Sequence, residues 1–410
     1  MSARDRITVV ARTGRGRDRP ARWPLWPAIR TRSRPMAGRR RSMLVSLAVA
    51  ATIGVGLAPV LAAAQVGAAA RLGNVTIYLA PASKGGKDSN TGLSSNSPIL
   101  TLAHAQQVLT RLNPTGNVTV RITQGTYVAD AITWSFYVPG HTISFMPVNY
   151  SGGGRPPGGD PVFADPASGG VHVGQTWFTA VLPPAPSPLH NGGNTGLRFY
   201  YLAVEDYTQG ISFNGQAGHS WHNSTFYVQP SAGVNGNDVS GMTFQDIGDQ
   251  FAPSQTGYGA ILFTDSSHDD IYNNTFDDIY NSGDHDQLHA LYLTHFSSNN
   301  TIDKNLFENT NGEAVKVRDR SNDNNVADNT FSQTGGVAAY LDDFCDQACA
   351  NTASPKKYRE CASWGNRFND NTIRTGTVWD LIPPGETYAG GSPCSIPSGQ
   401  VRLSAAGNKS

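Results

Sequence analysis

The central part of the chain alternates apolar and polar residues in short runs that polar turns separate. The segments "GAILFTDSSHDDIYNNTF", "HALYLTHFSSNNTIDKNLF" and "EAVKVRDRSNDNNVADNTF" begin with a period-two pattern and end at Phe276, Phe307 and Phe331. A fourth copy begins with "VAAYLDDF" and closes with "WGNRF" at Phe368. Alternation of this kind, bounded by Asn and Gly turns, predicts short β-strands rather than helices.

The copies recur at steps of 31, 24 and 37 residues, and fainter copies end at Phe226 and Phe244. One coil of this length cannot bury its own apolar face, whereas stacked coils with parallel strands about 4.8 Å apart can. The asparagine in each x-N-x-F turn is expected to adopt the left-handed conformation and to hydrogen-bond from coil to coil. The pattern therefore predicts an all-β solenoid, a single-stranded parallel β-helix.

The stretch that precedes the copies predicts an entry strand and a capping helix. "NVTIYLA" reads as a strand and is followed by a loop rich in Gly, Ser and Asn. A helix is then expected, capped near Ser97 with Pro98 in its first turn. This helix is expected to cover the open end of the stack and to protect an exposed strand edge.

The entry segment "IYLAPASKGGKDSNTG…SPILTLAHA" and the turns "NNTF", "KNLF" and "DNTF" resemble those of the right-handed parallel β-helix proteins of the pectate-lyase-like superfamily. The resemblance covers roughly residues 74–380. It implies a right-handed parallel β-helix domain over 74–380, followed by a C-terminal tail, 381–410, packed on the last coil. Because this fold carries lyases, hydrolases, epimerases and binding proteins, the resemblance implies no single function.

Residues 1–70 have a different composition. The first 42 residues contain 13 arginines, no lysine and two aspartates, and residues 43–70 carry no charge. This order of a basic region, an apolar region and small residues predicts an export signal, cleaved after Ala64 or Ala70. Translation from Met36 would shorten the basic region. If segment 43–61 is not cleaved, it would act as a membrane anchor instead.

Without this basic head the chain has a net charge of −11, so the head gives no reason to expect a nucleic-acid partner. We expect a secreted, extracellular monomer. Outside the cytoplasm, four cysteines predict two disulfides with an open choice of pairing, and a zinc site is the alternative. These cysteines are Cys345, Cys349, Cys361 and Cys394.

The strand pattern decides which residues face outward. The valines on either side of Lys316 are expected to point inward, because the opposite register would bury Lys316 and Arg318 without partners. In the fourth copy the same pattern places Ala339 and Leu341 inward. The outward residues are then expected to form three columns, namely Ala260, Ala290, Ala314 and Ala338; Leu262, Tyr292, Lys316 and Tyr340; and Thr264, Thr294, Arg318 and Asp342.

A groove that places Lys316 between Tyr292 and Tyr340, with Arg318 alongside, suits an acidic sugar. The cations would bind a uronate carboxylate, and Arg318 would do so in bidentate fashion. Lys316 is predicted to abstract the C5 proton, with its own pKa depressed by the neighbouring arginines. Tyr292 or Arg318 would protonate the leaving oxygen. The prediction is a polysaccharide lyase that cleaves a uronate-containing glycan by β-elimination.

The resemblance adds that chondroitinase-B-like and alginate lyases place a lysine base and an arginine on this kind of surface. In those enzymes the two residues come from different coils, whereas Lys316 and Arg318 share one strand. "SGDHDQLHALYLTH" supplies further polar residues. His289 joins the predicted catalytic set of Lys316, Arg318 and Tyr292, and substrate-binding roles are predicted for Arg320, Tyr340, Asp342 and His295. Asp284 and Asp286 are weak candidates for Ca²⁺ ligands, the one cofactor considered.

Several alternatives remain open. Asp342 and Asp343 are a candidate carboxylate pair for a glycoside hydrolase. A C5-epimerase would use similar lysine, histidine and tyrosine chemistry, and a non-catalytic surface protein would bind glycan on the same face. The three cations could also form solvated ion pairs with Asp319, Asp342 and Asp343. The sequence leaves the sugar identity undecided.

Overall fold

The computed structural model describes residues 72–165, 175–215, 233–249, 257–283, 287–334, 339–344, 360–374 and 395–410. All of these residues belong to one compact unit, Val66–Ser410. The predicted export signal, 1–70, lies outside the described residues. No helix among the described residues is long and apolar enough to cross a bilayer.

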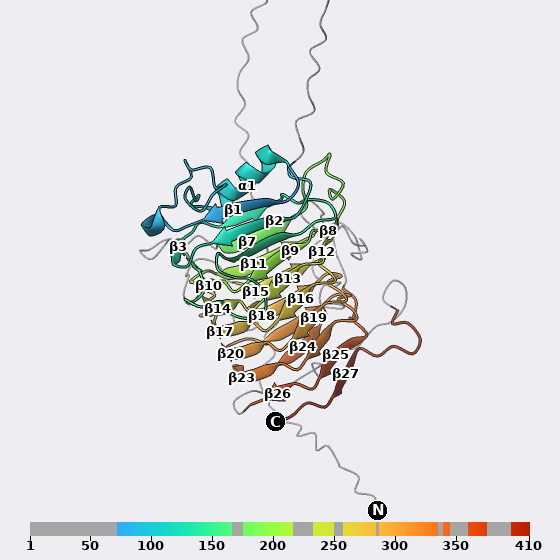
Figure 1. The fold of residues 1–410 in the computed structure, drawn as a ribbon. Coiled ribbons are helices and arrows are strands. Elements are labelled where there is room, and N and C mark those ends of the chain that lie inside the picture. Colours follow the sequence, from blue (N-terminus) through green and yellow to red (C-terminus); the bar gives the residue numbers. More distant parts are fainter. Residues whose placement is uncertain are drawn as a thin grey trace, which may run out of the picture. The chain divides into compact units, whose positions relative to one another are not determined.

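Three parallel sheets run along this unit, and successive strands of the chain pass from one sheet to the next (Figure 1). Sheet A comprises β1 (Val75–Leu79), β2 (Val118–Ile122), β5 (Ile143–Pro147), β9 (Leu197–Tyr200), β13 (Asp238–Ser240), β16 (Asp270–Tyr272), β19 (Thr301–Asp303), β22 (Asn325–Ala327), β25 (Asn366–Asn369) and β27 (Leu403–Ala406). Sheet B comprises β3 (Thr126–Val128), β6 (Val162–Ala164), β10 (Ala203–Glu205), β14 (Thr243–Ile247), β17 (Thr275–Ile279), β20 (Leu306–Thr310), β23 (Thr330–Thr334) and β26 (Thr372–Ile373).

Sheet C comprises β4 (Ile132–Trp134), β7 (Thr176–Val181), β11 (Gln209–Asn214), β15 (Gly259–Thr264), β18 (His289–Thr294), β21 (Val315–Arg318) and β24 (Tyr340–Asp343). A separate two-stranded sheet joins β8 (Gly193–Asn194) and β12 (Val234–Asn235). Each repeat contributes one strand to sheet C, then one to sheet A, then one to sheet B. The predicted parallel β-helix is therefore confirmed.

The phenylalanines that end the copies before the fourth point into the interior from sheet B. The fourth copy does not end at Phe368 as predicted, because Phe368 lies on β25 in sheet A opposite Val326, and Ile373 takes the sheet B position opposite Phe331. The rings of Phe244, Phe276, Phe307 and Phe331 stack in sequence with centroid separations of 5.1, 5.0 and 4.8 Å. These side chains are fully buried, and each removes a large apolar surface from water. The separations match the strand spacing, so the rings stack because the coils stack.

Asparagine side chains connect the coils at the corner between sheets A and B. Asn274, Asn305, Asn329 and Asn371 each accept a hydrogen bond at Oδ1 from the backbone N–H at the equivalent position of the preceding coil. Their Nδ2 groups donate to backbone carbonyls of that coil, as Asn305 does to Ile271 O at 2.8 Å. This ladder satisfies buried backbone groups that the sheets leave unpaired at the corner.

The left-handed conformation falls one residue earlier than predicted. Asn273, Lys304, Asp328 and Asp370 have φ of about 55°, and each precedes a ladder asparagine. The coil-to-coil bonding by asparagine is confirmed, whereas its left-handed conformation is wrong. The ladder asparagine must aim its amide along the stack, and the residue before it makes the turn.

The N-terminal helix α1 (Leu102–Leu112) begins later than predicted, with Thr101 rather than Ser97 as its N-cap. Thr101 accepts a bond from the His104 N–H, and Asp88 Oδ1 accepts from the Leu100 and Thr101 N–H groups. Ile99 forms a parallel bridge with Leu79, so the segment after Ser97 is extended. A short 3₁₀-helix, η1 (Ala82–Lys84), precedes it.

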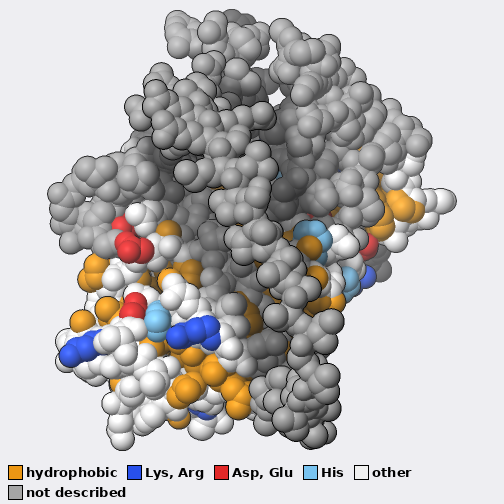
Figure 2. All heavy atoms as spheres, turned by 90° about the horizontal axis from the view of Figure 1, so that it is seen from above, with side chains coloured by type: hydrophobic (Ala, Val, Ile, Leu, Met, Phe, Trp, Pro, Cys, Tyr) orange, Lys and Arg blue, Asp and Glu red, His pale blue; other side chains and the backbone are white. Residues whose placement is uncertain are grey.

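The helix α1 lies at the β1 end of the stack and buries Leu102, Ala105, Val108 and Leu109 against the core (Figure 1). Figure 2 looks onto this end, where the described side chains of both charges lie among apolar ones.

The register of the last strand in sheet C differs from the prediction by one residue. Val315 pairs with Tyr340, Lys316 with Leu341, and Arg318 with Asp343. Tyr340 and Asp342 therefore point inward, and the predicted inward orientation of Ala339 and Leu341 is wrong. The interval from Phe331 to Leu341 is one residue longer than that from Phe307 to Lys316. A period-two pattern does not reveal such a shift, which reverses the face of every side chain.

The C-terminal residues continue the stack. β27 pairs with β25 in sheet A, and Asn408 adds a further step to the asparagine ladder by accepting from Asn371. Arg402 Nη2 lies 3.1 Å from Asp342 Oδ1, and it also donates to the Asp342 carbonyl. Burial raises the pKa of Asp342 to about 7, and Arg402 partly offsets that rise.

The ladder leads to a stability prediction. Asn305→Ala removes the acceptor of the Asn274 N–H and the donor to Ile271 O, leaving buried backbone groups unpaired. We expect the free energy of unfolding to fall by about 2–5 kcal/mol. Denaturant titration of the full chain measures this. Thr301→Ala, at an exposed position of β19, is the control and should change stability by less than about 0.5 kcal/mol. Equal effects of the two substitutions would contradict the role of the ladder.

Candidate functional site

The outer face of sheet C collects most of the predicted catalytic residues. Tyr292 on β18 lies in register with Lys316 on β21, as predicted. We call the following residues on and beside this face the sheet C cluster: His289, Tyr292, Glu313, Lys316, Arg318, Asp343 and Glu360.

Tyr292 is the centre of the cluster. Arg318 Nη1 lies 3.4 Å from its hydroxyl oxygen, and Lys316 Nζ lies 5.9 Å from its ring centroid. The His289 ring meets the Tyr292 ring edge-on at 5.0 Å. Tyr292 is partly exposed, whereas His289 is 1% exposed. Tyr292 is thus a partly exposed proton-carrying residue that lies against the buried His289.

His289 and Glu313 form a buried pair at the start of neighbouring strands. His289 Nδ1 lies 3.1 Å from Glu313 Oε2 and 3.1 Å from the Glu313 carbonyl oxygen. Both oxygens are acceptors, so Nδ1 carries the ring proton. Burial lowers the pKa of His289, and bonding to Glu313 only partly offsets this. Burial favours a higher pKa for Glu313, but His289 and Lys316 outweigh it and leave that pKa lowered. The pair therefore combines a carboxylate with a neutral imidazole.

The two cations that face outward from β21 have carboxylate partners. Arg318 Nε lies 2.7 Å from Glu360 Oε2, and Lys316 Nζ lies 3.4 Å from Asp343 Oδ2. Burial acts to lower the pKa of Arg318, but Glu360, Tyr292 and Asp343 together raise it well above its usual value. Lys316 is on the predicted face yet only 6% exposed. The alternative of ion pairs with Asp319, Asp342 and Asp343 holds for Lys316 with Asp343 and for Arg320 with Asp319, whereas Arg318 pairs with Glu360 instead. These pairs are largely buried rather than solvated.

A second group of charges lies on the turn that follows sheet C. Asp319 Oδ2 lies 2.8 Å from His295 Nδ1, and Asp319 Oδ1 accepts from Arg320 Nε at 2.8 Å. Burial favours a higher pKa for Asp319, but His295 and Arg320 outweigh it and leave that pKa lowered. Ligand atoms of His295, Asp319 and Glu360 lie within 4.8 Å of one another and could hold a metal ion. Two guanidinium groups already bind these carboxylates, which weakens the case for a metal there.

The substrate-binding roles predicted for Tyr340 and Asp342 are wrong, because both side chains are buried inside the solenoid. Tyr340 is fully buried, and its ring centroid lies 5.4 Å from that of Phe368 inside the solenoid. Asp342 is fully buried and paired with Arg402. Because Asp342 points inward and Asp343 outward, the two carboxylates cannot face one substrate bond. The predicted hydrolase pair is therefore wrong.

Other predicted residues cannot be placed. Asp284 and Asp286 lie outside the described residues, as do Cys345, Cys349 and Cys394. Cys361 is disulfide-bonded, and its pairing stays open.

The sequence reasoning missed Glu313 and Glu360. Glu313 occupies the same position in its repeat as His289 does 24 residues earlier, so the alignment of the repeats was a signal that could have found this pair. Glu360 follows a long insertion and reaches Arg318 from 42 positions away. No local pattern predicts such a contact.

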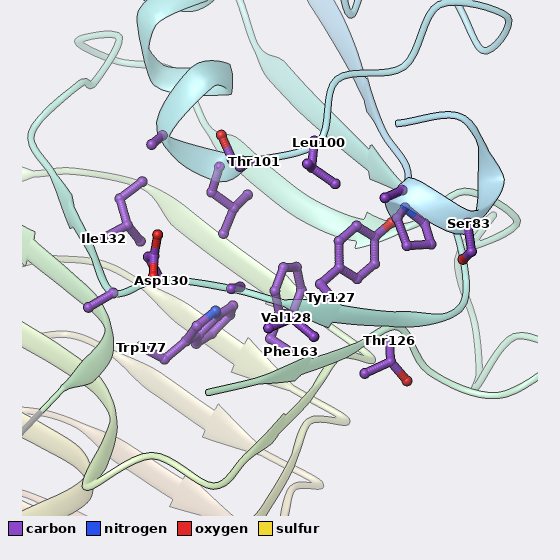
Figure 3. Close-up of a pocket in the computed structure, with 16 residues that line it drawn as sticks. Ser83, Leu100, Thr101, Thr126, Tyr127, Val128, Asp130, Ile132, Phe163 and Trp177 are labelled. Carbon is purple, nitrogen blue, oxygen red and sulfur yellow. The ribbon is translucent and has the colours of Figure 1, made fainter. Parts of the chain in front are cut away.

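A cavity of about 380 Å³ lies elsewhere, beneath the start of α1 (Figure 3). Tyr127, Phe163 and Trp177 form an aromatic wall, with centroids 4.9 and 5.0 Å apart along the series. Asp130 is the one ionisable carboxylate among its described lining residues. This largely apolar cavity lacks the opposed charges of the sheet C cluster.

The comparisons with known proteins identify the fold. A family model described as "Right handed beta helix region" matches residues 190–352. The fold is thus a single-stranded right-handed parallel β-helix, as the resemblance implied. No curated protein matches the sequence.

Several solved structures are similar in fold at low identity. The catalytic domain of a GH87 α-1,3-glucanase, in complex with nigerose, is 11% identical with a TM-score of 0.32, and covers 68% of this chain. This chain spans about half of that structure's length, 51%. A rhamnogalacturonan lyase is 12% identical, with a TM-score of 0.29 and coverage of 75% of this chain and 84% of the lyase. The A-module of an Azotobacter vinelandii mannuronan C-5 epimerase is 10% identical, with a TM-score of 0.29 and coverage of 81% and 95%.

The inward position of Tyr340 predicts that its ring contributes to core packing and that its hydroxyl does not contribute to stability. The Tyr340 hydroxyl has no hydrogen-bond partner among the described residues. Tyr340→Phe should therefore keep stability within about 1 kcal/mol or raise it. Tyr340→Ala should lower the free energy of unfolding by about 3–5 kcal/mol, because it opens a core cavity. Thermal and denaturant unfolding measure both. A Tyr340→Phe protein that loses several kcal/mol would show that the hydroxyl is bonded.

Proposed function

We propose that this protein is a secreted, carbohydrate-active enzyme, a polysaccharide lyase that acts on a uronate-containing glycan at the sheet C cluster. The observation that supports this most is the position of the Tyr292 hydroxyl, 3.4 Å from the Arg318 guanidinium and on an accessible face. A tyrosine held by an arginine and flanked by a lysine offers a proton donor beside positive charge. That combination is what the elimination of a uronate requires.

The proposed reaction moves two protons. The C5 proton of the uronate passes to a base, the C4–O bond breaks, and a C4=C5 double bond forms. Tyr292 donates its proton to the departing oxygen, while Lys316 and Arg318 stabilise the negative charge that develops on the uronate carboxylate. We assign the base to neutral His289, whose Nδ1–H is held by Glu313 and whose Nε2 is left to accept.

This assignment replaces Lys316 as the base. Lys316 Nζ lies 3.4 Å from Asp343 Oδ2, and this ion pair suits a fixed positive charge better than a base. Because His289 is nearly fully buried, substrate must displace neighbouring side chains to reach it.

One observation favours a glycoside hydrolase as a second candidate. Asp343 and Glu360 contact neighbouring cations on one side of the solenoid, so two carboxylates are present near Tyr292. Hydrolysis needs an acid and a base or nucleophile of this kind.

Product analysis distinguishes the two functions. The full chain is incubated separately with a panel of polyuronates and neutral glucans. A lyase raises ultraviolet absorbance through the new conjugated double bond and releases reducing ends from polyuronates alone. A hydrolase releases reducing ends without that absorbance. Absence of both products from every substrate would reject an enzymatic role at this face.

Tyr292→Phe tests the proton donor. We expect turnover to fall by about 100-fold or more, with substrate binding largely kept, because the ring remains and the proton is lost. Tyr272→Phe is the matched control, since Tyr272 is an exposed tyrosine on sheet A. Retention of full activity by Tyr292→Phe would rule out this mechanism.

A further inference from the structure

One position in a second side-chain ladder breaks its pattern. At the corner between sheets C and A, successive coils carry Asn237, Asp269, Asn300, Asn324 and Asn366. Each side chain accepts at Oδ1 from the backbone N–H of the ladder residue before it, from Asp269 onward. Asp269 is a fully buried carboxyl in a place where the neighbouring coils use an amide.

The amides of this ladder donate to a fixed carbonyl of the preceding coil. Asn300 Nδ2 donates to Ser266 O at 3.2 Å, Asn324 Nδ2 to Ser297 O at 3.0 Å, and Asn366 Nδ2 to Ser321 O at 3.1 Å. The equivalent carbonyl for Asp269 is that of Val234. A carboxylate has no proton to give, so Asp269 cannot repeat this bond as an ionised group.

The Ser266 hydroxyl occupies the place of the missing amide. Ser266 Oγ lies 2.5 Å from Val234 O and 2.6 Å from Asp269 Oδ2. In later coils the equivalent serines donate within their own turn, as Ser297 does to Thr294 O at 2.8 Å and Ser321 to Arg318 O at 2.7 Å. Ser266 instead bridges the carbonyl of the preceding coil and the Asp269 carboxyl.

A count of protons decides the state of this bridge. Ser266 Oγ has one proton, and the Val234 carbonyl has none. If Asp269 is ionised, the single hydroxyl proton can serve only one of the two oxygens, and the other faces Ser266 Oγ across a short contact with no proton between them. If Asp269 Oδ2 is protonated, it donates to Ser266 Oγ, which donates in turn to Val234 O, and every short contact has its proton.

We propose that Asp269 binds one structural proton in the folded protein and that release of this proton makes the stability of these coils depend on pH. Asp269 Oδ1 accepts from the N–H and Nδ2 of Asn237 at 2.8 and 2.9 Å. The proton is therefore assigned to Oδ2. No other serine–carboxyl bridge of this form occurs in the described part of the ladder.

Burial in the corner supports this state. Burial raises the pKa of Asp269 to about 7, the bonds from Ser266 and Asn237 oppose that rise, and the Asp270 charge adds to it. Other titratable or charged groups on the elements packed around it are Asp265 and His268 on its own turn, Asp238 on β13, Arg198 on β9 and His295 on the next turn.

The proton has a structural link to the sheet C cluster. The turn that carries Asp269 begins at Asp265, whose N–H donates to the carbonyl of His295 at 2.9 Å. His295 in turn holds Asp319, whose neighbour Arg318 binds Tyr292. Loss of the proton would loosen the coil against which these charged turns are stacked.

The sign of the pH effect follows from the raised pKa. Between about pH 4 and pH 7 the unfolded chain loses the Asp269 proton while the folded protein keeps it, so stability falls as pH rises. The ratio of folded to unfolded protein should fall about tenfold per pH unit from this one group, and the slope should end above about pH 7. Below about pH 4 both states hold the proton, and this contribution is complete.

The test compares pH profiles of the full chain. Denaturant unfolding is measured from pH 4.5 to pH 8.5 for the wild type, Asp269→Asn and Asp328→Asn. Asp328 is an exposed residue before a ladder asparagine, and it serves as the matched control. We expect the profile of Asp269→Asn to be shallower than that of the wild type by about tenfold per pH unit, because other groups such as Asp342 contribute equally to both profiles. Asp269→Asn should also be more stable than the wild type above pH 7, and Asp328→Asn should run parallel to the wild type. Parallel profiles for wild type and Asp269→Asn would overturn the proposal.

A spectroscopic measurement covers the case in which Asp269→Asn does not fold. Infrared spectra of the wild type with ¹³C-labelled aspartate should contain protonated carboxyl bands at pH 6, where exposed aspartates are ionised. Since Asp342 is also expected to hold a proton at this pH, the Asp269 band is identified by its response to Ser266→Ala. Ser266→Ala removes the acceptor of the proposed proton and should shift that band. A wild-type spectrum with carboxylate bands alone at pH 6 would also overturn the proposal.

Discussion

Hydrogen bonding from each coil to the next is the constraint on which this structure depends. Backbone bonds in three sheets fix the rise per coil, and the side-chain ladders close the corners where the sheets end. Once that rise is set, residues at equivalent positions of successive coils contact one another, so phenylalanines stack at about the strand spacing. The same coil-to-coil contacts recur in every repeat, so a substitution in one repeat changes the packing of both neighbouring repeats.

The sheet C cluster shows the opposite principle. Its charges do not repeat from coil to coil, and each buried cation has its own carboxylate partner. A buried charge without a partner costs several kcal/mol, so the partners must come from wherever the chain can supply them. Asp319 is the immediate sequence neighbour of Arg320, whereas Glu360 comes from beyond an insertion. Departure from the repeat therefore marks the part of the surface that a purely structural solenoid would not need.

The ladders also limit which polar groups the turns can hold. An asparagine both accepts and donates, so it can satisfy a backbone N–H on one side and a carbonyl on the other. An aspartate can only accept unless it carries a proton. Asp269 fits the ladder through the hydroxyl of Ser266, and this substitution couples a structural element to proton concentration. Among the described residues, Asp342 is also a strongly buried carboxyl with a pKa raised to about 7, but it has Arg402 as a partner.

The sequence by itself determined the repeat, the parallel β-helix, the inward valines around Lys316 and the outward register of Tyr292 with Lys316. These follow from alternation and repeat length, which are local properties of the chain. Only the tertiary structure decided that Tyr340 and Asp342 face inward, that α1 begins after Thr101, and that Glu360 reaches Arg318. The physical reason is that alternation along a strand divides its side chains between two faces. It does not determine which face is buried when the preceding turn changes length by one residue. Contacts across an insertion depend on where the folded coils carry the two ends, and no spacing along the chain encodes that distance.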